Sequence, residues 1–593
     1  MKSAFWIRQI ANIRGCLWPA WLVRLCLNGR FLGGGSALSG CVALLFVPSM
    51  SALAAPDAGA LQQQIEREQA RPLPQQGASE VLAPPAAASP KRGNALEVRG
   101  FKFRGNKLLS SAQLEAALEP YRQKALDFAE IDGLTSAVAA YYRAQGFLAS
   151  VVLPAQDVSD GVVTFVVVEA VVGKVVAYPQ ADARTDPQRV QALVAAQLPR
   201  GQVFRAGSLD RALLLASDLP GVAVTGALAE GEAGRQTDLL LKVVDKPLWS
   251  GDATMDNAGS RSTGVNRLSF NGFGNSVMGL GDLWSASALV NAGSTYLRLA
   301  ASAPLGLDGL RLGANASRLE YRIADSVYAS QQLEGASGVL GLEAMYPLVR
   351  TPQKNVYFSA ALDHKNFLNY ASGSAVSDYA SRALVWSLYG NRFDDFAGGG
   401  GTSANLTLTQ GHLVLDSYPG HADDASTLQT AGDYRKLRYA LSRQQFVAQD
   451  LILLASWSGQ WTDQNLDSSE KFGLGGSAGV RAYPSGEGSG AIGQLLTAEL
   501  RWRWSDALAL SAFYDTGSVT INARNDYVGA SALNAYSLSG GGLALDWQPS
   551  RRTSVKFTWA RRTGSNPNPA ASGNDQDGSL VQDRLWASAS LAF

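Results

Sequence analysis

The sequence predicts a transmembrane β-barrel preceded by two small α+β domains and a short N-terminal helix. Between residues 96 and 246 the order strand, helix, helix, strand, strand occurs twice. From residue 247 to the end the helical period disappears, and strand-like segments of roughly ten residues alternate apolar and polar side chains. This alternation is typical of a wall with lipid on one face and a polar lumen on the other.

The composition excludes several other classes of protein. The formal net charge of the 593-residue chain is +1, which gives no support for a nucleic-acid partner. The three cysteines all precede residue 42 and the three histidines lack ligand spacing, so we expect neither disulfides nor a metal site. Nucleotide-binding and hydrolase motifs are absent from the sequence, so we expect no cofactor, no catalytic residues and no enzymatic activity.

The N-terminal region predicts export. Arg24 and Arg30 precede a short apolar run, and Ala52-Leu53-Ala54 resembles a cleavage site, so we interpret residues 1–54 as a signal peptide. Residues 55–73 predict a polar helix with little apolar face, which needs a partner surface or a wet cavity to be stable. Residues 74–95 are rich in Pro and Ala and predict a linker.

The two α+β units, at 96–172 and 173–246, have helix-start signals. Ser110 or Ser111 is a candidate cap in the first unit, and Asp186 followed by Pro187 fits a helix start in the second. The expected elements are 96–106, 110–118, 128–145, 147–153 and 162–168, then 173–177, 186–196, 208–217, 222–228 and 238–244.

The barrel region, 247–593, places charge on one strand face and Leu or Trp on the other. Leu297 and Leu299 oppose Tyr296, and Trp502 opposes Glu499. A sheet in hydrocarbon must close, because an open edge leaves backbone groups without hydrogen bonds.

Two segments predict an ion pair between a loop and the barrel wall. Phe472–Gly488 is a glycine-dense loop that carries Arg481, and the strand segment Phe513–Gly517 carries Asp515. Opposite unit charges about 4 Å apart attract by about 4 kcal/mol at an effective dielectric constant near 20. Such a pair fits a loop folded back and tied to a wall, either for transport or for barrel stability alone.

These segments resemble the signatures of the two-partner secretion transporters (TpsB), in the superfamily whose POTRA domains precede an outer-membrane barrel. Further segments that resemble this family are Leu153–Asp157, Asp218–Val222, Asp256–Ser260 and Tyr346–Arg350, the last resembling a short periplasmic turn. The resemblance implies about sixteen strands, two POTRA domains and a plug helix in the pore.

The resemblance also implies site residues. The loop tip Val480, Arg481, Ala482 and Tyr483 is expected to fold into the lumen, with Arg481 reaching Asp515 on a wall that also presents Phe513 and Gly517. The family usually has glycine where this chain has Ala482, so Gly486 and Gly488 are expected to supply the positive-φ positions. Leu591 and Phe593 resemble the C-terminal signal read by the barrel-assembly machinery.

The expected function is export of a large partner protein through the bacterial outer membrane, with the POTRA domains in the periplasm. The partner implied is a β-helical haemolysin or adhesin with an N-terminal transport domain, and the barrel is expected to contact outer-membrane lipid. Strand addition suits an unfolded substrate, and the expected POTRA edge is Val222, Val224, Gly226 and Leu228. Folding of the partner outside the cell is the expected driving force.

The main alternative is an assembly factor that inserts other barrels into the membrane. It shares the loop and aspartate motifs, but the main assembly proteins carry more than two POTRA domains. An uptake channel would need a plug domain or TonB box, and neither is visible in the sequence.

Overall fold

The computed structural model describes residues 57–68, 81–82, 96–179, 184–324, 330–415, 417 and 419–593. The expected signal peptide lies outside these residues, as do residues 55–56 and 69–73 of the expected helix and most of the expected linker. The described helix, α1, spans Ala58–Glu68. Among the described residues, none of the helices has the length and hydropathy of a membrane span.

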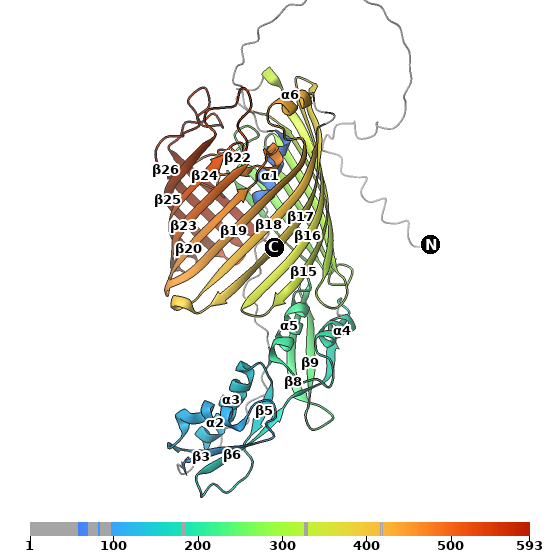
Figure 1. Cartoon of the computed structure of the whole chain (residues 1–593), viewed down its shortest axis with the longest axis vertical. Helices are drawn as coiled ribbons and strands as arrows, with labels where there is room; N and C mark the ends of the chain where they lie inside the picture. The colour runs from blue at the N-terminus through green and yellow to red at the C-terminus, as the bar shows by residue number, and fades with distance from the viewer. Residues whose placement is uncertain are drawn as a thin grey trace, which may run out of the picture. The chain divides into compact units, whose positions relative to one another are not determined.

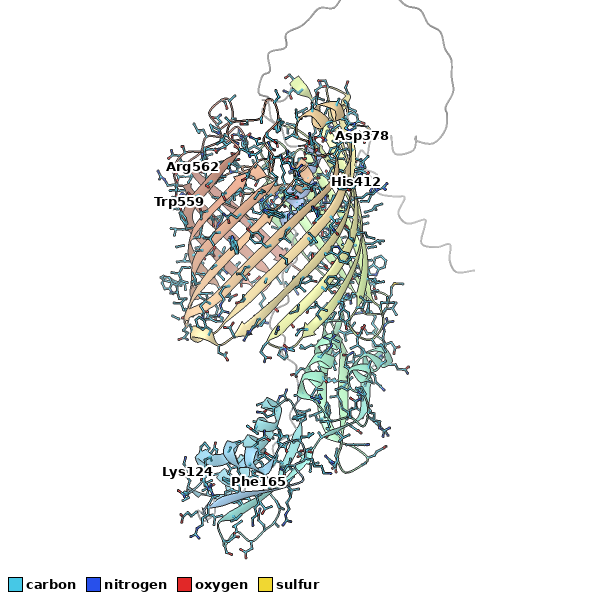
Figure 2. All side chains as sticks on the ribbon, viewed as in Figure 1. Lys124, Phe165, Asp378, His412, Trp559 and Arg562 are labelled. Atoms are coloured by element: carbon cyan, nitrogen blue, oxygen red, sulfur yellow. The ribbon has the colours of Figure 1, made fainter. Side chains whose placement is uncertain are left out.

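The first α+β unit packs two helices against a sheet of order β3-β6-β5, in which β3 runs parallel to β6. Both helices begin at a capping box, Ser110 with Gln113 and Asp127 with Glu130. Phe165 is fully buried in the core of this unit (Figure 2). Its elements are β2 Leu96–Glu97, β3 Gly100–Arg104, α2 Ser111–Leu118, a 3-10 turn Glu119–Tyr121, β4 Ala125–Leu126, α3 Phe128–Ala144, β5 Ala149–Val152 and β6 Val162–Glu169.

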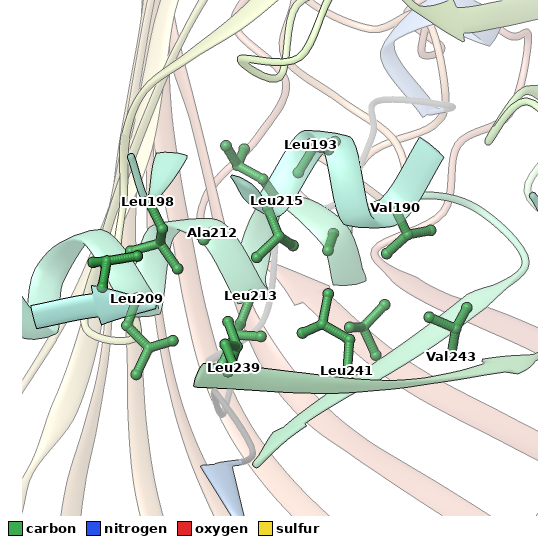
Figure 3. Close-up of a cluster of buried hydrophobic side chains, with 14 of the residues drawn as sticks. Val190, Leu193, Leu198, Leu209, Ala212, Leu213, Leu215, Leu239, Leu241 and Val243 are labelled. Carbon is green, nitrogen blue, oxygen red and sulfur yellow. The ribbon is translucent and has the colours of Figure 1, made fainter. Parts of the chain in front are cut away.

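The second α+β unit has the sheet order β1-β8-β9-β7. Asp186 caps α4 by accepting a hydrogen bond from the Gln188 amide, with Pro187 at the first helical position, as predicted. Figure 3 shows Leu213 of α5 directed toward Leu239 and Leu241 of β9 in the core. The elements are β1 Val81–Leu82, β7 Val171–Pro179, α4 Pro187–Gln197, α5 Ala206–Ser217, β8 Val222–Glu230 and β9 Gln236–Asp245.

Sixteen antiparallel strands form a closed barrel, which confirms the predicted fold class (Figure 1). The strands are β10 Trp249–Asp256, β11 Arg267–Asn275, β12 Leu283–Val290, β13 Ser294–Pro304, β14 Arg311–Arg322, β15 Glu334–Arg350, β16 Lys354–Ala371, β17 Ser374–Asp394, β18 Gly400–Val414, β19 Gly432–Ala448, β20 Leu451–Trp461, β23 Ile492–Ser505, β24 Leu508–Thr520, β25 Ala535–Ser550, β26 Thr553–Arg562 and β27 Asp583–Ala592. The loops contain α6 His421–Ser426, 3-10 turns at Phe396–Gly398 and Ser468–Glu470, and the hairpin β21 Phe472–Gly473 with β22 Ser489–Gly490.

The strand faces follow the predicted alternation. Leu297 and Leu299 are half exposed on the outer face. Tyr296, which faces the lumen, is fully buried. Trp502 likewise faces outward and Glu499 inward. The barrel closes through pairing of β10 with β27, so the backbone groups of both end strands are satisfied within the wall.

Residues 346–350 do not form the expected periplasmic turn. They are the end of β15, which continues through an irregularity between Pro347 and Val349, and the chain turns at 351–353 instead. Pro347 is tolerated because a bulge needs no ladder hydrogen bond from its nitrogen. The strand end carries Arg350, which donates two hydrogen bonds, of 2.8 and 2.7 Å, to the Asp218 carboxylate of the second α+β unit.

Candidate functional site

The long loop between β20 and β23, residues 462–491, folds against the inner face of the barrel wall, and we call it the lumen loop. Its tip is almost completely buried: Val480, Ala482 and Tyr483 are at most 1% exposed. They pack in one apolar cluster with inward-facing residues of β24 and β25, among them Phe513 and Leu538. Gly476, Gly486 and Gly488 of this loop have positive φ angles of 106°, 88° and 70°, which includes both glycines expected to do so.

Arg481 at this tip is bound from several sides. Its Nε and a terminal nitrogen donate to the two Asp515 oxygens at 2.8 and 2.9 Å, and the Arg481 amide donates to the same carboxylate at 3.1 Å. The other terminal nitrogen donates to Glu499 at 2.9 Å. The guanidinium carbon lies 3.4 Å from the centre of the Phe513 ring. Bidentate and cation–π contacts in a buried site are the strong forms of these interactions.

Small residues on the wall allow the loop to approach. A Cβ at Gly517 would lie 2.3 Å from a Leu474 methyl and 2.5 Å from a backbone oxygen, so only glycine fits there. A Cβ at Gly540 would lie 2.4 Å from the Cβ of Ala482. The absence of a side chain at Gly540 therefore makes room for the methyl group of Ala482.

Sequence reasoning missed three contacts at this site. Trp586 of β27 donates its indole hydrogen to the Arg481 carbonyl oxygen at 2.8 Å. Arg562 of β26 pairs with Asp575, and its guanidinium carbon lies 4.7 Å from the centre of the Tyr483 ring. Trp586 was detectable, because it occupies an inward position on an otherwise polar face. The other contacts depend on the path of the loop at 563–582, which no local pattern indicates.

Glu487 ties the lumen loop to the loop at 563–582. Its side chain is fully buried and accepts hydrogen bonds from Asn566, at 2.9 Å, and from the Gln576 amide, at 2.8 Å. Burial raises the pKa of Glu487 to about 7, because its two hydrogen-bond donors compensate only part of the lost hydration.

The α1 helix lies inside the barrel, where Ala58, Leu61 and Ile65 belong to an apolar cluster formed with inward-facing wall residues (Figure 1). A Cβ at Gly59 would lie 2.7 Å from the Ser468 Oγ, so the helix and the lumen loop are in close contact. The Arg67 guanidinium donates to backbone carbonyl oxygens of the same loop, including Gly475 at 3.1 Å.

Two ion pairs join α1 to the wall, and both wall cations have a second carboxylate. Lys365 lies 3.0 Å from Glu66 of α1 and 3.5 Å from Glu470 of the lumen loop. Arg267 lies 2.5 Å from Glu68 of α1 and 2.8 Å from Asp256.

Glu470 is itself held ionised by cations. Burial alone raises the pKa of Glu470, but Lys436 and Lys365 outweigh burial and lower it to about 2. The carboxylate is therefore available to Lys365 whether or not α1 is in place.

The expected substrate edge of the second α+β unit is partly occupied. The β8 strand, which contains Val222, Val224, Gly226 and Leu228, pairs with β9 on one side. On the other side Gly226 and Ala227 pair in parallel with Val81 and Leu82 of β1. The expectation of a free edge is therefore wrong at these two positions. Val222 and Val224 point into the core of the unit. The segment expected to be a linker thus contributes a short strand, β1, to the sheet of the second α+β unit.

The C-terminal residues lie at the closing seam of the barrel. Leu591 and Phe593 are both 53% exposed on the outer face. Phe593 exchanges backbone hydrogen bonds with Gly251 and stacks on Phe270 with ring centres 5.7 Å apart.

Comparison with known families decides what this architecture belongs to. The model of the family described as haemolysin secretion/activation protein ShlB/FhaC/HecB matches residues 235–542, more than half of the chain. The chain belongs to this family. A second model, of the ShlB-type POTRA domain, matches residues 96–170. The protein is therefore a TpsB transporter of the outer membrane that exports a partner exoprotein, with its POTRA region in the periplasm.

Individual proteins agree with the family. The haem/hemopexin transporter protein HuxB of Haemophilus influenzae is 25% identical over 550 residues, covering 90% of this chain and 96% of HuxB. The structure of CdiB from Escherichia coli aligns with a TM-score of 0.63 at 19% identity, covering 90% of this chain and 98% of CdiB. BamA from Haemophilus ducreyi lacking POTRA domains 1–3 has a TM-score of 0.54 at 14% identity, covering 84% of this chain and all of that one. The BamA likeness is one of fold, and the family supports the transporter over the assembly factor.

Proposed function

We propose that the exported partner is a long β-helical haemolysin or adhesin whose unfolded N-terminal transport domain binds by strand addition to β8. The observation that carries this proposal is the parallel pairing of β1 with Gly226 and Ala227 of β8. It supports the idea that this edge accepts an additional strand through main-chain hydrogen bonds, which tolerate variable side chains.

Substrate binding at β8 is also proposed to release the plug. The strand β1 and the helix α1 belong to the same N-terminal segment, residues 57–82. A substrate strand that replaces β1 removes one attachment of this segment. The α1 helix then leaves the lumen more readily, and the barrel provides the path to the cell surface.

The lumen loop is proposed to stay anchored through Arg481 and Asp515 during transport, with Phe513 and Gly517 shaping its seat. Barrel-assembly machinery is proposed to recognise Leu591 and Phe593, which are exposed at the end of β27. We propose no catalytic step and no cofactor, since folding of the partner outside the cell can drive export.

A reversible lock on β8 tests the proposal. We expect a disulfide formed by Leu82→Cys with Ala227→Cys, which are paired positions, to stop secretion of the co-expressed partner. Reduction should restore secretion. The matched control is Ala223→Cys with Val244→Cys, which links β8 to β9 and leaves the outer edge unchanged.

Mass spectrometry of the cross-linked peptide reports how complete the lock is. Normal secretion from a fully cross-linked Leu82–Ala227 population would show that β8 is not the substrate edge. Export itself is tested separately by deleting residues 96–246, which should remove the partner from the medium while the barrel still assembles.

A further inference from the structure

A polar row crosses the outer face of the barrel where the apolar positions of β16 and β17 end. In the strand register the row runs through four paired positions: His364, Arg382, His412 and Asp433. These side chains face outward, since the adjacent residues Lys365, Ser381, Leu413 and Tyr434 are buried on the lumen side. Figure 2 labels His412 on the wall formed by β17 and β18.

The row lies at the extracellular edge of the apolar band. His364 is ten residues beyond Lys354, the first residue of β16 at the periplasmic turn. Ten residues at about 3.3 Å each, tilted by about 40°, rise about 25 Å, which is the height of the apolar band of such barrels. The outward-facing residues between Lys354 and His364 are all apolar: Val356, Phe358, Ala360 and Leu362.

An apolar groove adjoins the row on its membrane side. It has a volume of about 740 Å³ and is lined by outward-facing Leu342, Leu362 and Leu384. His364 and Arg382 also line it, one register row closer to the cell surface. The groove is therefore apolar along its length and polar at its extracellular end.

The polar end has unused hydrogen-bonding capacity. Arg382 forms no hydrogen bond or ion pair with any residue that the structure describes. The Nδ1 of His364 is buried and has no hydrogen-bond partner among those residues. By contrast, His412 in the same row pairs with Asp433 at 2.7 Å. An unpaired guanidinium beside lipid is unfavourable unless a lipid headgroup supplies the anion.

We propose that this groove binds a phosphorylated glycolipid of the outer leaflet. Its acyl chains lie along Leu342, Leu362 and Leu384, and a phosphate accepts hydrogen bonds from the Arg382 guanidinium and from the Nε2 of His364, because the Nδ1 is buried. The outer leaflet is the source because the cationic end lies at the extracellular boundary of the apolar band. A guanidinium matches phosphate geometry better than a lysine ammonium does.

The test is native mass spectrometry of the purified full-length protein with diphosphorylated lipid A and with its dephosphorylated form. Arg382→Gln should lower retention of the diphosphorylated lipid by about fivefold, the effect of one cation near an anionic headgroup. Arg382→Lys should retain part of the binding. The matched control is Arg561→Gln on β26, where an exposed arginine is already paired with Asp583.

Three results would overturn the proposal: unchanged binding by Arg382→Gln, equal binding of the dephosphorylated lipid, or an equal loss in Arg561→Gln. Equal competition by phosphatidylglycerol would show that the site does not select the outer-leaflet lipid. Heat-modifiable gel mobility verifies that each barrel is folded. His364→Gln, which also faces outward, provides a second variant that leaves the lumen contacts intact.

Discussion

The tip of the lumen loop and the α1 helix both lie inside the barrel, but they are held in different ways. Arg481 of the loop binds Asp515 and Glu499, two wall carboxylates that are at most 7% exposed. The α1 helix supplies Glu66 and Glu68 to the wall cations Lys365 and Arg267, and each of these cations has another carboxylate within 3.5 Å.

This difference has a thermodynamic consequence. Removing one partner of a buried ion pair costs about 3–5 kcal/mol, because the other charge remains unpaired in a poorly hydrated site. If the loop tip left the wall, Asp515 would lose the guanidinium that binds both of its oxygens. If α1 left, Lys365 would keep Glu470 and Arg267 would keep Asp256. We therefore propose that the loop is a fixed anchor and that the helix is a removable plug.

Charge reversal at the loop anchor should have the largest effect. Arg481→Asp or Asp515→Arg alone should destabilise the folded barrel by about 3–5 kcal/mol and stop secretion, because like charges then meet in a buried site. The double variant restores one cation beside two carboxylates, since Glu499 remains. Urea titration of heat-modifiable mobility measures stability, and partner protein in the medium measures transport.

The double variant separates the two roles of the pair. Recovery of both stability and secretion supports an anchor that transport needs. Recovery of secretion without any loss of stability in the single variants would show that the buried pair is not the anchor described here.

The attachment of the lumen loop to the loop at 563–582 should depend on pH through Glu487. Its pKa in the folded protein, about 7, lies above the ordinary value of 4.5, so folding favours the protonated form. The contribution to loop stability is therefore complete below pH 4.5 and is lost as the pH rises through about 7. A shift of this size corresponds to about 3 kcal/mol.

Hydrogen exchange of the 563–582 backbone between pH 4.5 and 8, corrected for the intrinsic rate, measures this contact. Glu487→Gln, which is neutral at every pH, should flatten the profile. A wild-type profile as flat as that of the variant would show that Glu487 is ionised throughout.

Replacing a glycine should have different effects at the seat of the lumen loop and in the α1 helix. Gly517→Ala should destabilise the barrel by about 1–3 kcal/mol, because its Cβ meets both Leu474 and a backbone oxygen that cannot move aside. Gly59→Ala should leave barrel stability unchanged and favour release of α1, since its Cβ meets the Ser468 Oγ at 2.7 Å. Urea titration measures barrel stability, and single-channel conductance measures release of α1. Equal destabilisation of the barrel by Gly517→Ala and Gly59→Ala would contradict a fixed loop and a removable helix.

Much of the barrel and the anchor could be predicted from the sequence. Strand alternation is a local property, and Asp186 and Pro187 are local helix-start signals. The loop–wall pair was expected through resemblance, because its residues lie in two short motifs. The attachment of α1 was not predictable, since Lys365 and Arg267 lie about 200–300 residues away on different strands. The β1 strand was missed because two apolar residues in a Pro- and Ala-rich segment carry no strand period.

The smallest expected effect comes from removing Asp256, the second carboxylate beside the wall cation Arg267. In Asp256→Asn, Arg267 depends on Glu68 alone, so departure of α1 leaves a buried guanidinium without a full charge partner. We expect the plug to be retained more strongly by about 1 kcal/mol, which lowers the open fraction about fivefold. Glu68→Gln should have the opposite effect and raise conductance. Asp252→Asn is the matched control, because Asp252 faces the same lumen from β10 and bonds to Asn271 and Thr254 rather than to α1. Higher conductance in Asp256→Asn would show that Asp256 stabilises the plugged state instead of easing its release.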